Sequence, residues 1–196
     1  MDKEAQKRLA DDFVEVLRTT NRDGIEELIR YLQEETDFFT APASAKYHGA
    51  FESGLLMHSI NVCAELNLDP NSKVYPPETI IIVALLHDIC KANCYHTEKR
   101  NVKENGAWVE KQVYVFEDEL PLGHGEKSLY LASKFIKLSD EEAAAIRWHM
   151  GAFDNAFRGG DRGLNAAYEK YPLAVLLHMA DMRATYLVER GDDYDR

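Results

Sequence analysis

The chain contains few cysteines and no long apolar segment. Three cysteines, Cys63, Cys90 and Cys94, occur among 196 residues, an odd number without the C-x-x-C spacing of a zinc knuckle. We therefore expect reduced thiols rather than disulfides. No apolar run reaches transmembrane length, and Met1 to Lys7 lack the apolar segment of a signal peptide. These absences predict a cytoplasmic protein without a membrane partner.

Positive charge is also scarce. The 23 lysines and arginines face 34 aspartates and glutamates, which gives a formal net charge of −11. Broad binding to duplex nucleic acid requires basic side chains that neutralise phosphates, so we expect no duplex nucleic acid as a partner. Some basic residues do cluster and indicate either a solvated loop or the phosphate-facing rim of a site; they are Lys91, Lys99, Arg100, Lys103 and Lys111, followed later by Arg158 and Arg162.

The sequence lacks internal repeats, low-complexity tracts and linkers. A chain of 196 residues with 45% hydrophobic content fits one domain with a substantial core. In the first forty positions apolar residues recur at helical spacing, which predicts two helices that separate near Asn21 and Asp23. We therefore expect a single domain over 1–196, in which a helical extension (1–40) packs on a core of about residues 46–190.

Helical patterns continue through most of that core. Residues 51–66 suit a helix, and Pro76-Pro77 is a suitable helix entry because proline is tolerated in the first turn. The run Ile80–Val83 is locally strand-like, but the apolar residues continue to Leu86, and we predict a buried helix. Further helices are expected near Gly125, after the capping box Ser139–Glu142 and from Pro172, with loops over 67–77 and 150–163.

Residues 95–120 break the helical pattern. Residues 108–116 have the composition of a strand, and Asn105-Gly106 is a hairpin-turn dipeptide. We predict an all-α fold with one small β-hairpin inserted beside the functional site.

Six residues spread along the chain indicate one metal site. The strongest element is the adjacent pair His87-Asp88, which ends the apolar run. Burying a histidine and an ionised carboxylate is costly unless something compensates them. A divalent metal does so, because imidazole suits transition metals and carboxylate suits harder cations. Taken singly, the other candidates would more often be ordinary core residues; they are His58, His124, His149 and Asp181.

These residues follow the order H…HD…H…H…D, and the chain resembles the HD-domain superfamily of metal-dependent phosphohydrolases. Their sequence contexts match as well, at Gly54–Ser59, Leu85–Lys91, Gly123–Ser128, Ile146–His149 and His178–Asp181. The resemblance implies an HD/PDEase-like helical bundle whose side chains project inward to the metal.

The resemblance also implies a dinuclear site. It assigns His58, His87, Asp88 and Asp181 to one metal and Asp88, His124 and His149 to a second, with Asp88 bridging. Two divalent ions per chain (Fe, Mn, Ni, Zn or Co, with Mg also possible) share a hydroxide in such a site. No protein nucleophile is then needed, and we interpret Ser59 and Cys90 as packing residues.

Asp88 and Lys91 are the expected catalytic residues. By resemblance, Lys91 contacts phosphate or donates a proton to the leaving group, whereas the alternative is a surface lysine. We expect a small phosphorylated substrate, a nucleotide or another phosphodiester, contacted by His48, Lys91, Arg158 and Arg162. His48 lies in a segment similar to one in exoribonuclease-associated HD domains, although no OB-type module precedes residue 46.

Two other functions fit the same ligand set. Some family members are di-iron oxygenases, and oxygen uptake by an iron-loaded sample would identify one. The domain would instead be a nucleotide-sensing module if it bound a nucleotide without turnover. His178, three residues before Asp181, either orients that carboxylate or is an ordinary helix residue.

Overall fold

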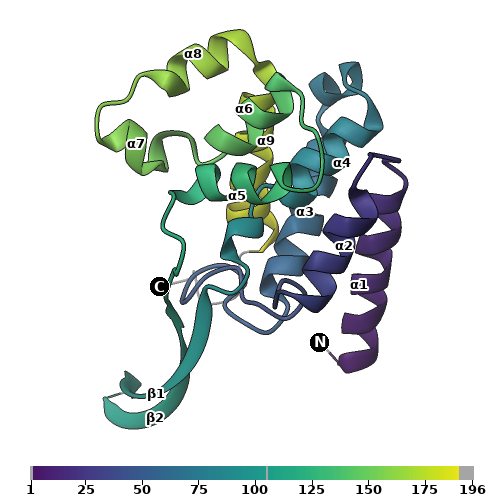
Figure 1. The fold of residues 1–196 in the computed structure, drawn as a ribbon. Helices are drawn as coiled ribbons and strands as arrows, with labels where there is room; N and C mark the ends of the chain where they lie inside the picture. Colours follow the sequence, from purple (N-terminus) through teal and green to yellow (C-terminus); the bar gives the residue numbers. More distant parts are fainter. Residues whose placement is uncertain (1, 105, 190–196) are drawn as a thin grey trace.

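The computed structural model describes residues 2–104 and 106–189 (Figure 1). In these residues nine α-helices and two strands follow one another as α1 (Lys3–Arg18), α2 (Ile25–Glu34), α3 (Gly54–Leu68), α4 (Pro77–Leu86), β1 (Tyr95–Glu104), β2 (Ala107–Phe116), α5 (His124–Ser133), α6 (Asp140–Trp148), α7 (Asn155–Arg158), α8 (Gly163–Lys170) and α9 (Pro172–Arg183). Short helical turns lie between them at η1 (Pro70–Val74), η2 (Ile89–Lys91), η3 (Gly151–Phe153) and η4 (Ala184–Val188).

The helix boundaries follow local chemistry. Pro77 occupies the first turn of α4, where its missing N–H costs nothing. Ser139 and Glu142 form the predicted capping box of α6, each side chain accepting a hydrogen bond from the other residue's backbone N–H. The strand-like run from Ile80 is helical, as predicted. The helix predicted over 51–66 begins three residues later, at Gly54.

Two segments that were predicted as loops contain helical turns. In 67–77, α3 runs to Leu68, and Asp69 then accepts a hydrogen bond from the backbone N–H of Asn71 at the start of η1. In 150–163, Asp154 caps α7 in the same way through the N–H of Ala156. The loop predictions missed these short helices, because an aspartate that favours a turn also caps a short helix.

The core explains why α3 and α4 are apolar on nearly every side. One buried cluster joins them to α1 and α2 through side chains such as Leu17, Leu28, Leu55 and Ile82. A second joins them to α6 and α9 through side chains such as Val62, Val83, Ile146 and Leu177. Helices α3 and α4 therefore lie between two layers, with α1 and α2 along one side (Figure 1). The N-terminal helices thus share a core with the rest of the chain, and the division at residue 40 stays a prediction.

The hairpin confirms the predicted break in the helical pattern. Strands β1 and β2 pair antiparallel from Tyr95↔Phe116 to Glu104↔Ala107, and Figure 1 shows them extending away from the helices. Asn105 of the predicted turn lies outside the described residues, as do Met1 and positions 190–196 of the predicted domain. The result is the predicted mainly helical fold with one hairpin.

None of the helices in the described part of the chain is both long enough and apolar enough to cross a membrane.

Candidate metal centre

Six predicted side chains converge from five separate segments. His58 lies on α3, His87 and Asp88 follow α4, His124 begins α5, His149 follows α6 and Asp181 lies on α9. Helix α4 ends at Leu86, and the backbone turns at Asp88 (φ −113°, ψ 15°) into η2. This turn brings the Asp88 carboxylate to the middle of the group.

The two oxygens of Asp88 face different histidines. Oδ1 lies 2.7 Å from His124 Nε2 and 3.4 Å from His149 Nε2. Oδ2 lies 3.4 Å from His87 Nε2 and 3.5 Å from His58 Nε2. Asp181 lies with the two histidines that face Oδ2, because its own Oδ1 is 3.2 Å from His58 Nε2. The distances to Asp88 alone divide the histidines as the resemblance implied, but His149 also lies within ligand distance of His87 and Asp181, and the division between two metals stays a prediction.

Backbone carbonyls fix the orientation of two of the rings. The Nδ1–H of His87 donates to the carbonyl of Ala84, and that of His149 to the carbonyl of Ile146, each at 2.7 Å. Since a carbonyl only accepts, Nδ1 carries the proton and the Nε2 lone pair is directed at the site. His149 Nε2 is buried and makes no hydrogen bond there, although buried polar atoms are nearly always paired.

In this group protonated imidazoles face ionised carboxylates, and a metal that binds there would take the place of the imidazole protons. Burial opposes ionisation of Asp88, but Lys91 and the neighbouring histidines hold its pKa well below the usual range. Burial likewise disfavours a charged His58, yet Asp181 and Glu189 raise its pKa to about 9. Burial also lowers the pKa of His124, but Cys90 and Asp88 have the larger effect and raise it to about 9. Four imidazoles and two carboxylates therefore form a buried donor set that fits a divalent transition metal.

Lys91 lies one turn beyond Asp88. Its Nζ is 2.7 Å from Asp88 Oδ2 in a nearly buried position. Burial favours a neutral lysine, but Asp88 raises the pKa of the ammonium above its ordinary value. Lys91 is therefore a cation held directly at the carboxylate that the two sets share.

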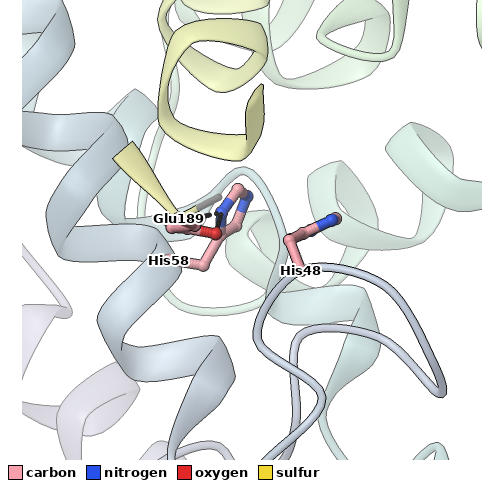
Figure 2. Close-up of side chains that lie close together, drawn as sticks. All are labelled: His48, His58 and Glu189. Carbon is pink, nitrogen blue, oxygen red and sulfur yellow. Dashed lines mark hydrogen bonds and ion pairs between the residues drawn. The ribbon is translucent and has the colours of Figure 1, made fainter. Parts of the chain in front are cut away.

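Glu189 is a member of the site that the sequence did not suggest. Both of its carboxylate oxygens lie 3.1 Å from His58 Nδ1 (Figure 2). Asn61 also donates a hydrogen bond to Oε1 at 2.9 Å. Its one signal is its position eight residues after Asp181. A helix continued past Arg183, as η4 does continue it, brings position 189 back to the site.

The predicted substrate residues occupy different positions. A cavity of about 1010 Å³ opens at Asp88, His124 and Asp181, and His48, Lys91 and Arg158 also line it. Arg162 is exposed and is not among the lining residues. No described hairpin residue lines this cavity. The hairpin nevertheless begins beside the site, because Tyr95 at the start of β1 lies close enough to Lys91 and Asp88 for their charges to act on its pKa.

His178 supports a metal-site histidine through the backbone. Its Nδ1–H donates to the carbonyl of His149 at 2.6 Å, so it orients that segment rather than Asp181. Gly151 allows this approach, because a Cβ there would lie 2.6 Å from the His178 ring, and its φ of +54° also favours glycine.

Comparison with known proteins agrees with this geometry. No curated protein and no solved structure gives a match to the chain. The model of the HD domain matches residues 56–185, a span that is well over half of the chain and includes all six converging residues. The chain therefore belongs to the HD domain family.

Proposed function

We propose that the protein is a metal-dependent phosphohydrolase that acts on a nucleotide or another phosphodiester through a dinuclear centre. The family suggests metal-dependent phosphohydrolysis in general. The observation that carries the finer proposal is the Asp88 carboxylate, whose two oxygens face two different sets of buried imidazoles.

In this proposal the first metal is held by His58, His87, Asp88 and Asp181. The second is held by Asp88, His124 and His149. Bound metal ions supply Lewis-acid activation of water and of the phosphoryl oxygens. The protein contributes a fixed donor arrangement, because Ala84 and Ile146 hold the protons of His87 and His149 on Nδ1 and Glu189 accepts from Nδ1–H of His58.

Lys91 supplies positive charge beside the shared carboxylate. Its ammonium remains protonated because Asp88 lies 2.7 Å away and raises its pKa. We expect this ammonium either to contact a phosphoryl oxygen of the substrate or to protonate the leaving group. Both tasks need a protonated amine at the edge of the metal centre.

The cavity has room and polarity for a small phosphorylated substrate. Arg158 and Phe153 both line it, and the Arg158 guanidinium lies 5.8 Å from the centroid of the Phe153 ring, so this part of the wall offers both a cation and an aromatic surface. Burial, followed by the charge of Lys91, lowers the pKa of His48 to about 4, and its buried Nε2 has no hydrogen-bond partner. We expect this neutral nitrogen to form a hydrogen bond with a polar group of the substrate. Arg162 would contact a substrate that extends out of the cavity.

The test is hydrolysis of bis(p-nitrophenyl) phosphate, a generic diester, by metal-stripped protein reloaded with Mn²⁺. We expect turnover that requires the metal and is lost in Asp88→Ala, whereas Arg158→Ala should mainly raise KM. Absence of turnover in protein that binds metal would contradict a diesterase and would favour a monoester phosphatase, an oxygenase or a sensor. Oxygen uptake by the iron-loaded protein separates the oxygenase from the other two.

A further inference from the structure

Cys90 contacts a metal-site histidine, although the sequence suggested only a packing role. It lies in η2, two residues after Asp88, and is 4% exposed. Its Sγ lies 3.4 Å from Nδ1 and 3.7 Å from Nε2 of His124. The backbone N–H of Cys90 donates to Ser128 Oγ at 3.2 Å, which ties η2 to α5 and holds the thiol at this ring.

Two of the three separations between neighbouring donor atoms match those of ligands around one ion, whereas the third, 2.7 Å between His124 Nε2 and Asp88 Oδ1, is a hydrogen bond that a bound metal would replace. Bonds of about 2.3 Å to sulfur and about 2.0–2.1 Å to nitrogen at a tetrahedral angle separate the two ligands by about 3.6 Å. The distance from Cys90 Sγ to His124 Nε2 is 3.7 Å. Nitrogen and oxygen ligands are separated by about 3.4 Å on the same basis, and His149 Nε2 lies 3.4 Å from Asp88 Oδ1.

An independent observation also indicates a ligand at this position. His149 is 0% exposed, its Nε2 has no hydrogen-bond partner, and that nitrogen faces Asp88 Oδ1. Cys90, Asp88 and His124 each offer a ligand atom within 4.8 Å of the other two. By the same measure His149 groups with His87 and Asp181, and its link to Cys90 is through Asp88. A shared ion would satisfy the lone pair of His149 and join these donors.

We propose that Cys90 provides a thiolate ligand to the second metal of the proposed centre, beside Asp88, His124 and His149. When the metal–sulfur bond forms, the thiol proton is released to water. The first metal has only nitrogen and oxygen ligands, from His58, His87, Asp88 and Asp181. The two positions therefore differ in softness, and the second favours Zn²⁺, Co²⁺ or Fe²⁺ over Mg²⁺.

The test is titration of metal-stripped protein with Co²⁺, followed by absorption spectroscopy. A cobalt–thiolate bond gives a charge-transfer band in the near ultraviolet, whereas imidazole and carboxylate ligands give only the weaker visible bands. We expect the charge-transfer band in the wild type and also in Cys63→Ser. This control removes a different thiol, which lies on α3 rather than in η2. Cys90→Ser should lose the band, keep the visible bands and bind Zn²⁺ at least about 10-fold more weakly, with little change for Mg²⁺.

A charge-transfer band that persists in Cys90→Ser would overturn the proposal, as would cobalt binding without such a band in the wild type. Cys90→Ala, with unfolding monitored by circular dichroism, separates loss of a ligand from loss of the fold. If no cobalt binds to the wild type, the proposed dinuclear centre fails together with this inference. If cobalt binds without the band, the inference alone fails.

Discussion

Two buried polar clusters in this protein are built in different ways. Around Glu142, which is 0% exposed, the chain itself supplies the partners. Arg22 pairs with both carboxylate oxygens, Thr79 donates to Oε1 at 2.8 Å and the backbone N–H of Ser139 donates to Oε2 at 2.9 Å. A single negative charge is matched by one cation and two neutral donors.

The cluster around Asp88 is not matched in this way. Four imidazoles and Lys91 face the three carboxylates of Asp88, Asp181 and Glu189. Nevertheless, the buried Nε2 of His149 has no hydrogen-bond partner. An unpaired buried polar group costs about 1–3 kcal/mol. The difference separates a structural cluster, which is complete within the chain, from one whose donor atoms could hold a metal ion.

The largest effect should come from isosteric neutralisation at the metal centre. Asp88→Asn keeps the shape of the side chain but removes the charge that both sets of imidazoles face. Lewis-acid stabilisation is worth several kcal/mol, and about 4 kcal/mol corresponds to about 10³ in rate. We expect kcat/KM for the diester to fall at least that far. Turnover restored by excess Mn²⁺ would contradict the bridging role of Asp88.

Replacing the buried carboxylate of Glu142 by an amide should lower the free energy of unfolding rather than the activity. Glu142→Gln leaves Arg22 without its counterion, and breaking a buried pair costs about 3–5 kcal/mol. Because the side chain of Arg22 is 23% exposed, we expect a loss near about 3 kcal/mol in urea unfolding, with kcat unchanged below the transition. A Glu142→Gln variant that is as stable as the wild type but inactive would contradict the structural role of this cluster.

A smaller effect is expected at Glu189, which accepts a hydrogen bond from His58. Loss of such a partner typically weakens metal binding about 10- to 100-fold. Glu189→Gln retains an acceptor, so a change near about 10-fold is expected in competition with a chelator of known affinity, and Glu189→Ala should lose more. Equal metal affinity in wild type and both variants would show that His58 does not depend on this carboxylate.

The pH dependence of stability should give the smallest difference. Burial raises the pKa of Glu142, but Arg22, Ser139 and Thr79 lower it below the ordinary value of a glutamate. A depressed carboxyl pKa stabilises the fold above the unfolded-state pKa, and that stability is lost as the pH falls below about 4.5. Metal-free wild type should therefore lose stability more steeply in this range than Glu142→Gln. Parallel curves for the two proteins would contradict the assignment.

The helices and the six converging residues could be predicted from the sequence because their signals are local. Periodicity predicts α1 and α2, the length of the apolar run predicts α4, and Pro172 predicts the start of α9. The pair His87-Asp88 is conspicuous at the end of the apolar run. The resemblance to a family supplied the rest of the ligand set. Short capped turns such as η1 and α7 were missed, since one aspartate decides them.

Contacts that depend on tertiary packing could not be predicted from the sequence. Glu189 gains its role only because η4 carries the chain back to His58. Cys90 resembles any other apolar residue in its segment until α5 packs His124 against it. The hairpin could be predicted as an element but not its direction, because no residue within it fixes how it leaves the helical body.

The most direct test of the account is the number of metal ions that the buried cluster binds. Metal-stripped wild type and Asp88→Asn would be dialysed against Mn²⁺ or Zn²⁺ and analysed for bound metal by elemental analysis. We predict about two ions per wild-type chain and a clear loss in the variant, with Glu142→Gln behaving as wild type. Failure of the wild type to bind more metal than Asp88→Asn would contradict the central claim that this cluster is a metal centre.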